Sequence, residues 1–135
     1  MAARASILVV DDYPDTLDVW RLSLRSAGYE VATAADGFTA LALAESLLPD
    51  LVVLDLELPG RSGYDVASQL RRNPATRRIP LIAATGFSHE AQLERARRAG
   101  FDVIVVKPCD PADLIAHIER LIVSADSEHP SADGR

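Results

Sequence analysis

The chain has 135 residues, 48% of them hydrophobic, which is enough for one compact domain and too few for two ordinary ones. Its formal net charge of -6 argues against direct binding to nucleic acid or to a membrane surface, because both depend on clustered positive charge. The single cysteine, Cys109, cannot form an internal disulfide, so we expect a cytoplasmic protein. No apolar run is long enough for a signal-peptide core or a membrane span.

Short apolar runs alternate with helical patterns along the chain. The first, third and fifth runs are continuous stretches of Val, Ile and Leu, as expected for strands of a parallel sheet that helices cover on both faces. The five predicted strands are residues 7–10, 29–33, 51–54, 79–83 and 103–106.

Helix start and stop signals lie between these runs. The first helix is expected to begin at Pro14 and to end at Gly28. The second is expected to bury Leu47 or Leu48 and to end at Pro49. The three remaining helices are predicted at residues 64–72, at residues 89–99 and from residue 111 onward.

Strict alternation of strand and helix predicts an α/β fold with right-handed crossovers and helices on both faces of the sheet. Five such units are typical of a flavodoxin-like, doubly wound parallel sheet of five strands, with strand order 2-1-3-4-5 and five helices. We expect one domain over residues 6–123, preceded by a short tail, residues 1–5. Residues 124–135 are rich in Ser, Asp, Glu, Pro and Gly and are predicted to be a disordered tail.

Polar residues follow the predicted strands where ligands bind in such sheets, at the carboxyl ends. Asp11 and Asp12 follow the first strand, Asp55 the third, Thr85 the fourth and Lys107 the fifth. Three neighbouring carboxylates resist joint ionisation unless positive charge compensates them. A divalent cation and Lys107 are the natural compensators.

Magnesium prefers oxygen ligands, and two carboxylates with one backbone carbonyl, for which Glu57 is the candidate, would be sufficient. Each residue alone also has a simpler interpretation. Asp12 could cap a helix, Asp55 could begin a turn, and Lys107 could be a solvated strand end. Their coincidence at one edge of the sheet favours a functional site.

The sequence resembles response-regulator receiver domains of two-component signal transduction, with a chemotaxis-regulator-like fold, over about residues 6–123. Four segments carry the resemblance, and it is their combination that is specific. They are LVVDD at residues 8–12, DLELPG at 55–60 with a glycine at 63, ATG at 84–86, and VVKP at 105–108.

The resemblance implies a role for each site residue. Asp55 is the phosphoryl acceptor and, with Asp11, Asp12 and the Glu57 carbonyl, holds Mg²⁺ or Mn²⁺. Thr85 is implied to bond a phosphoryl oxygen.

The resemblance also gives Lys107 the role of pairing with the phosphoryl charge, and it implies a cis peptide bond between Lys107 and Pro108, which proline makes inexpensive.

The implied partner is a histidine kinase or histidine phosphotransfer protein, which donates the phosphoryl group from phosphohistidine. The chain would catalyse only its own phosphorylation and dephosphorylation, so it is not expected to be an enzyme with a separate substrate. It would signal through contacts with a downstream protein that the sequence does not identify.

Two positions bear on how the phosphorylated state would signal and how long it would last. Family members commonly have an aromatic switch residue three positions before the lysine, where this chain has Ile104. A β-branched residue has few rotamers, so we expect the output to depend on backbone movement at residues 85–89. Glu57, two residues after the acceptor, is expected to alter the lifetime of the phosphoryl group.

Other functions are compatible with parts of the pattern. An aspartyl phosphatase would carry its acids as an Asp-x-Asp pair after the first strand, which this chain does not. A docking module that works without phosphorylation, and a receiver fragment of a hybrid histidine kinase, are the alternatives that stay open.

Overall fold

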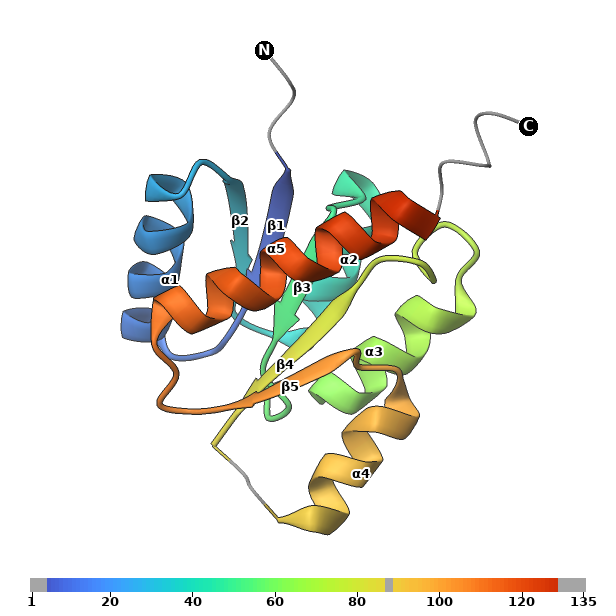
Figure 1. Cartoon of the computed structure of the whole chain (residues 1–135). Coiled ribbons are helices and arrows are strands. Elements are labelled where there is room, and N and C mark those ends of the chain that lie inside the picture. Colours follow the sequence, from blue (N-terminus) through green and yellow to red (C-terminus); the bar gives the residue numbers. More distant parts are fainter. Residues whose placement is uncertain (1–4, 87–88, 129–135) are drawn as a thin grey trace, which may run out of the picture.

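The computed structural model describes residues 5–86 and 89–128. Within them, strands and helices alternate and form one parallel sheet in the order β2-β1-β3-β4-β5, which confirms the predicted fold (Figure 1). The strands are β1 (Ser6–Val10), β2 (Glu30–Ala34), β3 (Leu51–Leu54), β4 (Leu81–Thr85) and β5 (Val103–Val106). The helices are α1 (Pro14–Ser26), α2 (Gly37–Leu47), α3 (Gly63–Arg72), α4 (Glu90–Ala99) and α5 (Pro111–Glu128).

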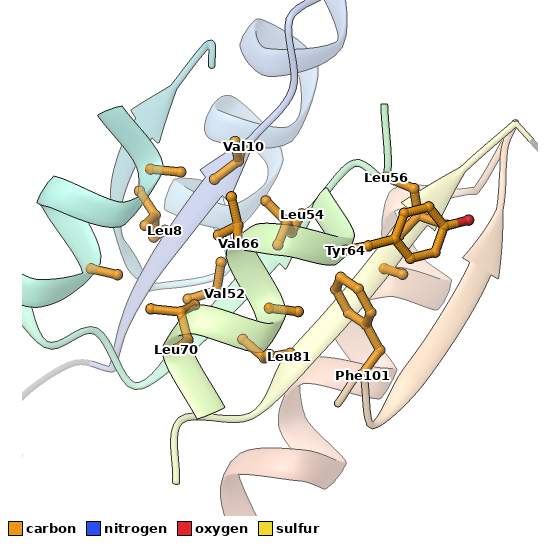
Figure 2. Close-up of a cluster of buried hydrophobic side chains, with 14 of the residues drawn as sticks. Leu8, Val10, Val52, Leu54, Leu56, Tyr64, Val66, Leu70, Leu81 and Phe101 are labelled. Atoms are coloured by element: carbon orange, nitrogen blue, oxygen red, sulfur yellow. The ribbon is translucent and has the colours of Figure 1, made fainter. Parts of the chain in front are cut away.

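The sheet is the middle of three layers. Helices α1 and α5 cover one face, where Trp20 and Leu24 pack with Leu114 and Ile118. Helices α2, α3 and α4 cover the other. Figure 2 shows this second core, in which side chains of α3 such as Leu70 lie over residues of the central strands.

Burial on both faces explains the continuous apolar runs. Leu8 and Val10 of β1 face the α2–α4 layer, whereas Ile7 and Val9 face α1 and α5, and all four are at most 1% exposed. Burying one such side chain contributes about 1.5–3 kcal/mol. A central strand without a polar side chain is therefore the stable arrangement here.

Local signals set the helix ends. The Asp36 side chain accepts a hydrogen bond from the Thr39 amide at 2.7 Å and caps α2, and Ser62 caps α3 through the Asp65 amide at 3.2 Å. Helix α4 ends at Gly100, whose φ of 115° lies in the left-handed region that favours glycine.

Three strands differ from their predicted bounds, and the smallest difference is that β1 begins one residue early, at Ser6. β4 begins at Leu81 rather than at residue 79, because Ile79 belongs to a turn in which its amide binds the Thr76 carbonyl at 3.0 Å. The strand instead extends to Thr85. β2 begins at Glu30, one residue later than predicted, where its pairing with β1 starts.

Two further expectations for helices were wrong. Leu47 and Leu48 are 54% and 52% exposed, because α2 packs through the small residues Ala40 and Ala44 and the chain turns at Leu48 in a left-handed conformation. Helix α5 continues to Glu128, so residues 124–128 are helical rather than part of a disordered tail. Ala and Glu in this segment are good helix formers.

The rest of both predicted tails, residues 1–4 and 129–135, lies outside the described residues. Among the helices that the structure describes, none has the length and apolar character needed to cross a membrane.

Candidate functional site

The strand register brings the two buried acids together. Val10 pairs with Leu54 across β1 and β3, so the residues that follow them, Asp11 and Asp55, lie next to each other. Asp11 is 1% exposed and Asp55 is 9% exposed. Asp12 is exposed, yet one carboxylate oxygen from each of the three acids lies within 4.8 Å of the others.

Lys107 reaches into this cluster from the end of β5. Its Nζ donates to Oδ2 of Asp11 at 2.6 Å and to Oδ2 of Asp55 at 3.0 Å. Its backbone amide binds the carbonyl of Thr85 at 2.7 Å. The peptide bond to Pro108 is cis, as predicted. The ammonium group is thus held between two carboxylates from different strands.

Backbone amides fix the other carboxylate oxygens. The Tyr13 amide donates to Oδ1 of Asp11 at 2.9 Å, and the Glu57 amide donates to Oδ1 of Asp55 at 3.1 Å. Each buried acid therefore has one oxygen bound by an amide and one bound by Lys107. This leaves both side chains in one defined orientation.

The two pKa shifts of the central pair have different causes. Burial raises the pKa of Asp55, and the hydrogen bonds from the Glu57 amide and Lys107 only partly oppose it. Burial alone would lower the pKa of Lys107, but its hydrogen bonds to Asp11 and Asp55 outweigh burial and raise it. Lys107 pairs with two carboxylates, whereas Asp55 has to share that one ammonium group with Asp11. The site therefore holds more negative than positive charge.

The donor set fits a hard divalent cation. Three carboxylates and one ammonium sum to a charge of about -2, which one divalent ion would compensate. Carboxylate oxygens are the ligands that Mg²⁺ prefers in proteins. The Glu57 amide contact places that backbone beside Asp55, while the Glu57 carbonyl as a ligand stays a prediction.

Thr85 is the last residue of β4 and is fully buried. It pairs with Val106, directly before Lys107, so the strand register confirms that the threonine and the lysine lie at the same edge of the sheet. The bond of its hydroxyl to a phosphoryl oxygen stays a prediction. Residues 87–88 lie outside the described part, so the movement expected for residues 85–89 is also untested.

Gly63 lies directly against the backbone of Asp55 and Leu56. A Cβ at this position would lie 2.1 Å from the carbonyl oxygen of Asp55 and 2.7 Å from Cα of Leu56. The Gly63 amide also donates to the Leu56 carbonyl at 2.9 Å. The start of α3 is therefore packed directly on the backbone of the site.

Two aromatic contacts were not foreseen. The ring of Trp20 lies 5.9 Å from Nζ of Lys107, and a cavity of about 370 Å³ opens beside it. The guanidinium of Arg95 lies 3.9 Å over the ring of Tyr64, which links α4 to α3.

These features define a parallel α/β domain with an acidic pocket and one lysine at the carboxyl edge of its sheet. The family described as response regulator receiver domain matches residues 7–119. The chain therefore belongs to the response regulator receiver domain family.

Three similar proteins illustrate the range of the family. A 14.6 kDa protein of Leptolyngbya boryana, described as uncharacterized, is 37% identical and aligns over 87% of this chain and 90% of its own length. Response regulator PleD of Caulobacter vibrioides is also 37% identical, but the 90% of this chain that aligns spans only 26% of PleD.

The third is a solved structure, the receiver domain of sensor histidine kinase PA1611 from Pseudomonas aeruginosa. It is 34% identical with a TM-score of 0.83, and the alignment covers 89% of this chain and 98% of that one. That structure has a magnesium ion coordinated in its active site.

Proposed function

We propose that this domain is the phosphoacceptor of a two-component phosphorelay, taking a phosphoryl group from phosphohistidine onto Asp55. The donor is a histidine kinase or a histidine phosphotransfer protein. The observation that carries the proposal is the position of the Lys107 ammonium, within 3.0 Å of both Asp11 and Asp55 at the carboxyl edge of the sheet.

In the proposed reaction a carboxylate oxygen of Asp55 attacks the phosphorus atom. The phosphorus–nitrogen bond of phosphohistidine breaks, and the imidazole leaves with the bonding electrons. Lys107 neutralises charge on the transferred group, and the Thr85 hydroxyl donates to one of its oxygens. Mg²⁺ or Mn²⁺, held by Asp11, Asp12, Asp55 and the Glu57 carbonyl, would supply further neutralisation of that charge.

The phosphorylated state would differ in charge and in hydrogen bonding. A carboxylate with one negative charge becomes an acyl phosphate with about two. Lys107, now bound to Asp11 and Asp55, gains a third acceptor, and its backbone bond to Thr85 couples this change to the end of β4. Water later hydrolyses the acyl phosphate, so the domain resets itself without acting on a separate substrate.

The phosphodonor needs a surface next to this site. The cavity beside Lys107 is lined on one side by Trp20 and Val19 of α1. Val19 and Leu22 on the same helix are 51% and 61% exposed. Exposed apolar side chains of this kind mark contact surfaces, and we place the donor there.

Ile104 favours a second candidate, a docking module whose partner binds without phosphorylation. This residue is partly buried and packs against the core on the α2–α4 side of the sheet, so it is poorly suited to act as a rotating switch. The likeness to the PA1611 receiver also supports a biological setting in which the domain is part of a hybrid histidine kinase.

Intact-mass spectrometry after addition of acetyl phosphate and Mg²⁺ tests the proposal. We expect a gain of one phosphoryl group that a chelator and Asp55→Asn abolish. Asp65→Asn, on an exposed aspartate of α3, is the matched control and should still be phosphorylated.

A fold shown intact by circular dichroism, together with no phosphorylation from acetyl phosphate or from a phosphohistidine donor, would reject the phosphoacceptor function and favour the docking module.

A further inference from the structure

Positive charge is concentrated in one part of this acidic protein. Residues 71–102 contain seven of the 14 basic side chains and three of the 20 acidic ones, which is a net charge of +4. The rest of the chain therefore carries -10, and the total is -6. A contrast of this size within one small domain creates a local field that differs in sign from that of the whole molecule.

The basic side chains come together at one end of the fold. Helices α3 and α4 run back along the sheet and end near the start of β4 and β5, at the edge opposite Asp55 (Figure 1). Five exposed arginines lie on the last turns of these helices or on the loop after α3. We call Arg72, Arg77, Arg78, Arg97 and Arg98 the arginine patch.

A sixth arginine holds the supporting backbone in place. The guanidinium of Arg71 donates to the carbonyls of Arg77 at 2.6 Å, Ile79 at 2.8 Å and Gly100 at 2.7 Å. It thereby ties the end of α3, the following loop and the end of α4 to one another. A surface fixed in this way loses little conformational freedom when a partner binds.

Helix dipoles explain only part of the patch. Arg72, Arg97 and Arg98 lie in last turns, where cations stabilise a helix. Arg77 and Arg78 lie beyond the end of α3, outside the reach of that effect. Glu94 lies 3.1 Å from Arg97 and 3.6 Å from Arg98, and Glu90 lies 3.9 Å from Arg97. These two acids partly offset the arginines of α4, yet residues 71–102 keep a net charge of +4.

We propose that the arginine patch is a docking surface for an acidic segment of a partner protein. Guanidinium groups bind carboxylates through paired hydrogen bonds, so several of them side by side suit a short run of Asp and Glu. A long nucleic acid would extend past the patch onto the rest of the molecule, whose residues sum to -10, and would be repelled there. The opposite location of Asp55 leaves the phosphorylation site free, so this proposal does not rest on the phosphoacceptor function.

The test is fluorescence anisotropy of a labelled octaglutamate peptide with the full chain at about 0.02 M salt, where screening is weak. We expect binding that is lost at about 0.5 M salt. Arg72→Glu/Arg77→Glu should weaken it about tenfold, because two attractions become repulsions. These side chains are exposed, so thermal unfolding should show a folded protein.

The matched control is Arg25→Glu/Arg120→Glu, which reverses two exposed arginines on α1 and α5 and changes the net charge by the same amount. It should weaken peptide binding about twofold or less. Arg72→Gln/Arg77→Gln removes the charges without adding acids and should give an intermediate loss. If the Arg72→Glu/Arg77→Glu variant fails to fold, the Arg72→Gln/Arg77→Gln variant takes its place as the test of the arginine patch.

Three results would overturn the proposal. One is the absence of peptide binding at low salt. Another is an equal effect of the patch variant and the control variant, which would show that net charge alone matters. The last is tighter binding of an eight-nucleotide single-stranded DNA that depends on the same arginines, which would identify a nucleic-acid surface instead.

Discussion

Replacing Arg71 with methionine should destabilise the domain more than the same replacement at any other exposed or half-exposed arginine. The guanidinium of Arg71 donates to three backbone carbonyls and to the Asp102 carboxylate, at 2.6 to 3.0 Å. Methionine keeps much of the aliphatic packing but leaves those carbonyls without this donor. A hydrogen bond to a charged group contributes about 1.5–3 kcal/mol, so losing those of three carbonyls should cost at least about 4 kcal/mol.

The loss can be measured by urea unfolding followed by circular dichroism. With a slope of about 2 kcal/mol per M for a domain of this size, a loss of about 4 kcal/mol lowers the midpoint by about 2 M. Arg72→Met is the control, because Arg72 is the exposed neighbour on the same helix and should shift the midpoint by about 0.3 M or less.

Arg71→Lys separates charge from geometry. A single ammonium cannot reach three carbonyls from different segments, so this variant should lose more than half of the stability that Arg71→Met loses. A midpoint for Arg71→Met equal to that of Arg72→Met would refute the reasoning. A wild-type midpoint for Arg71→Lys would show that charge alone is needed.

Three further outcomes can be checked by the same unfolding assay. Asp55→Asn should be more stable than the wild type at pH 7, because burial raises the pKa of Asp55 and so disfavours its charged form in the folded state. This gain in stability should disappear as the pH falls below the pKa of Asp55 in the unfolded chain, where the carboxyl is protonated in both states. A gain in stability that persists at such a low pH would contradict burial of the charge as its cause. Gly63→Ala should cost about 1–3 kcal/mol, since its Cβ meets a backbone oxygen at 2.1 Å, and an unchanged midpoint would show that α3 can shift freely. Ser62→Ala should cost about 1 kcal/mol through the lost α3 cap, whereas Ser62→Asp should restore most of it.

The sequence was sufficient for those parts of the fold that depend on continuous burial. The strand at residues 51–54 is fully buried on both faces, so its apolar run and its limits coincide. Asp11 and Asp55 follow directly from this, because an acid that ends a buried run must lie at the edge of the sheet. The expected strand order was enough to predict that Lys107 lies close to both acids.

Features that depend on contacts between distant segments could not be predicted in this way. In the sequence Arg71 is one of several arginines around the end of a predicted helix, and no local pattern shows that it binds carbonyls 6 to 29 residues away. The sequence shows a glycine at position 63 but not that the carbonyl of Asp55 lies against it and leaves no room for a side chain. Ile79 was assigned to a strand because it is apolar, although it is buried in a turn.

Lys107 is the only lysine in the 135 residues, so every side-chain amine of this protein is at the site. Selective ¹⁵N labelling of lysine would give one Nζ resonance, which reports the environment between Asp11 and Asp55 without any introduced probe. Amine-reactive reagents likewise have one side-chain target, 24% exposed and bound by two carboxylates. The composition of the chain thus provides a single spectroscopic and chemical reporter of the state of its own pocket.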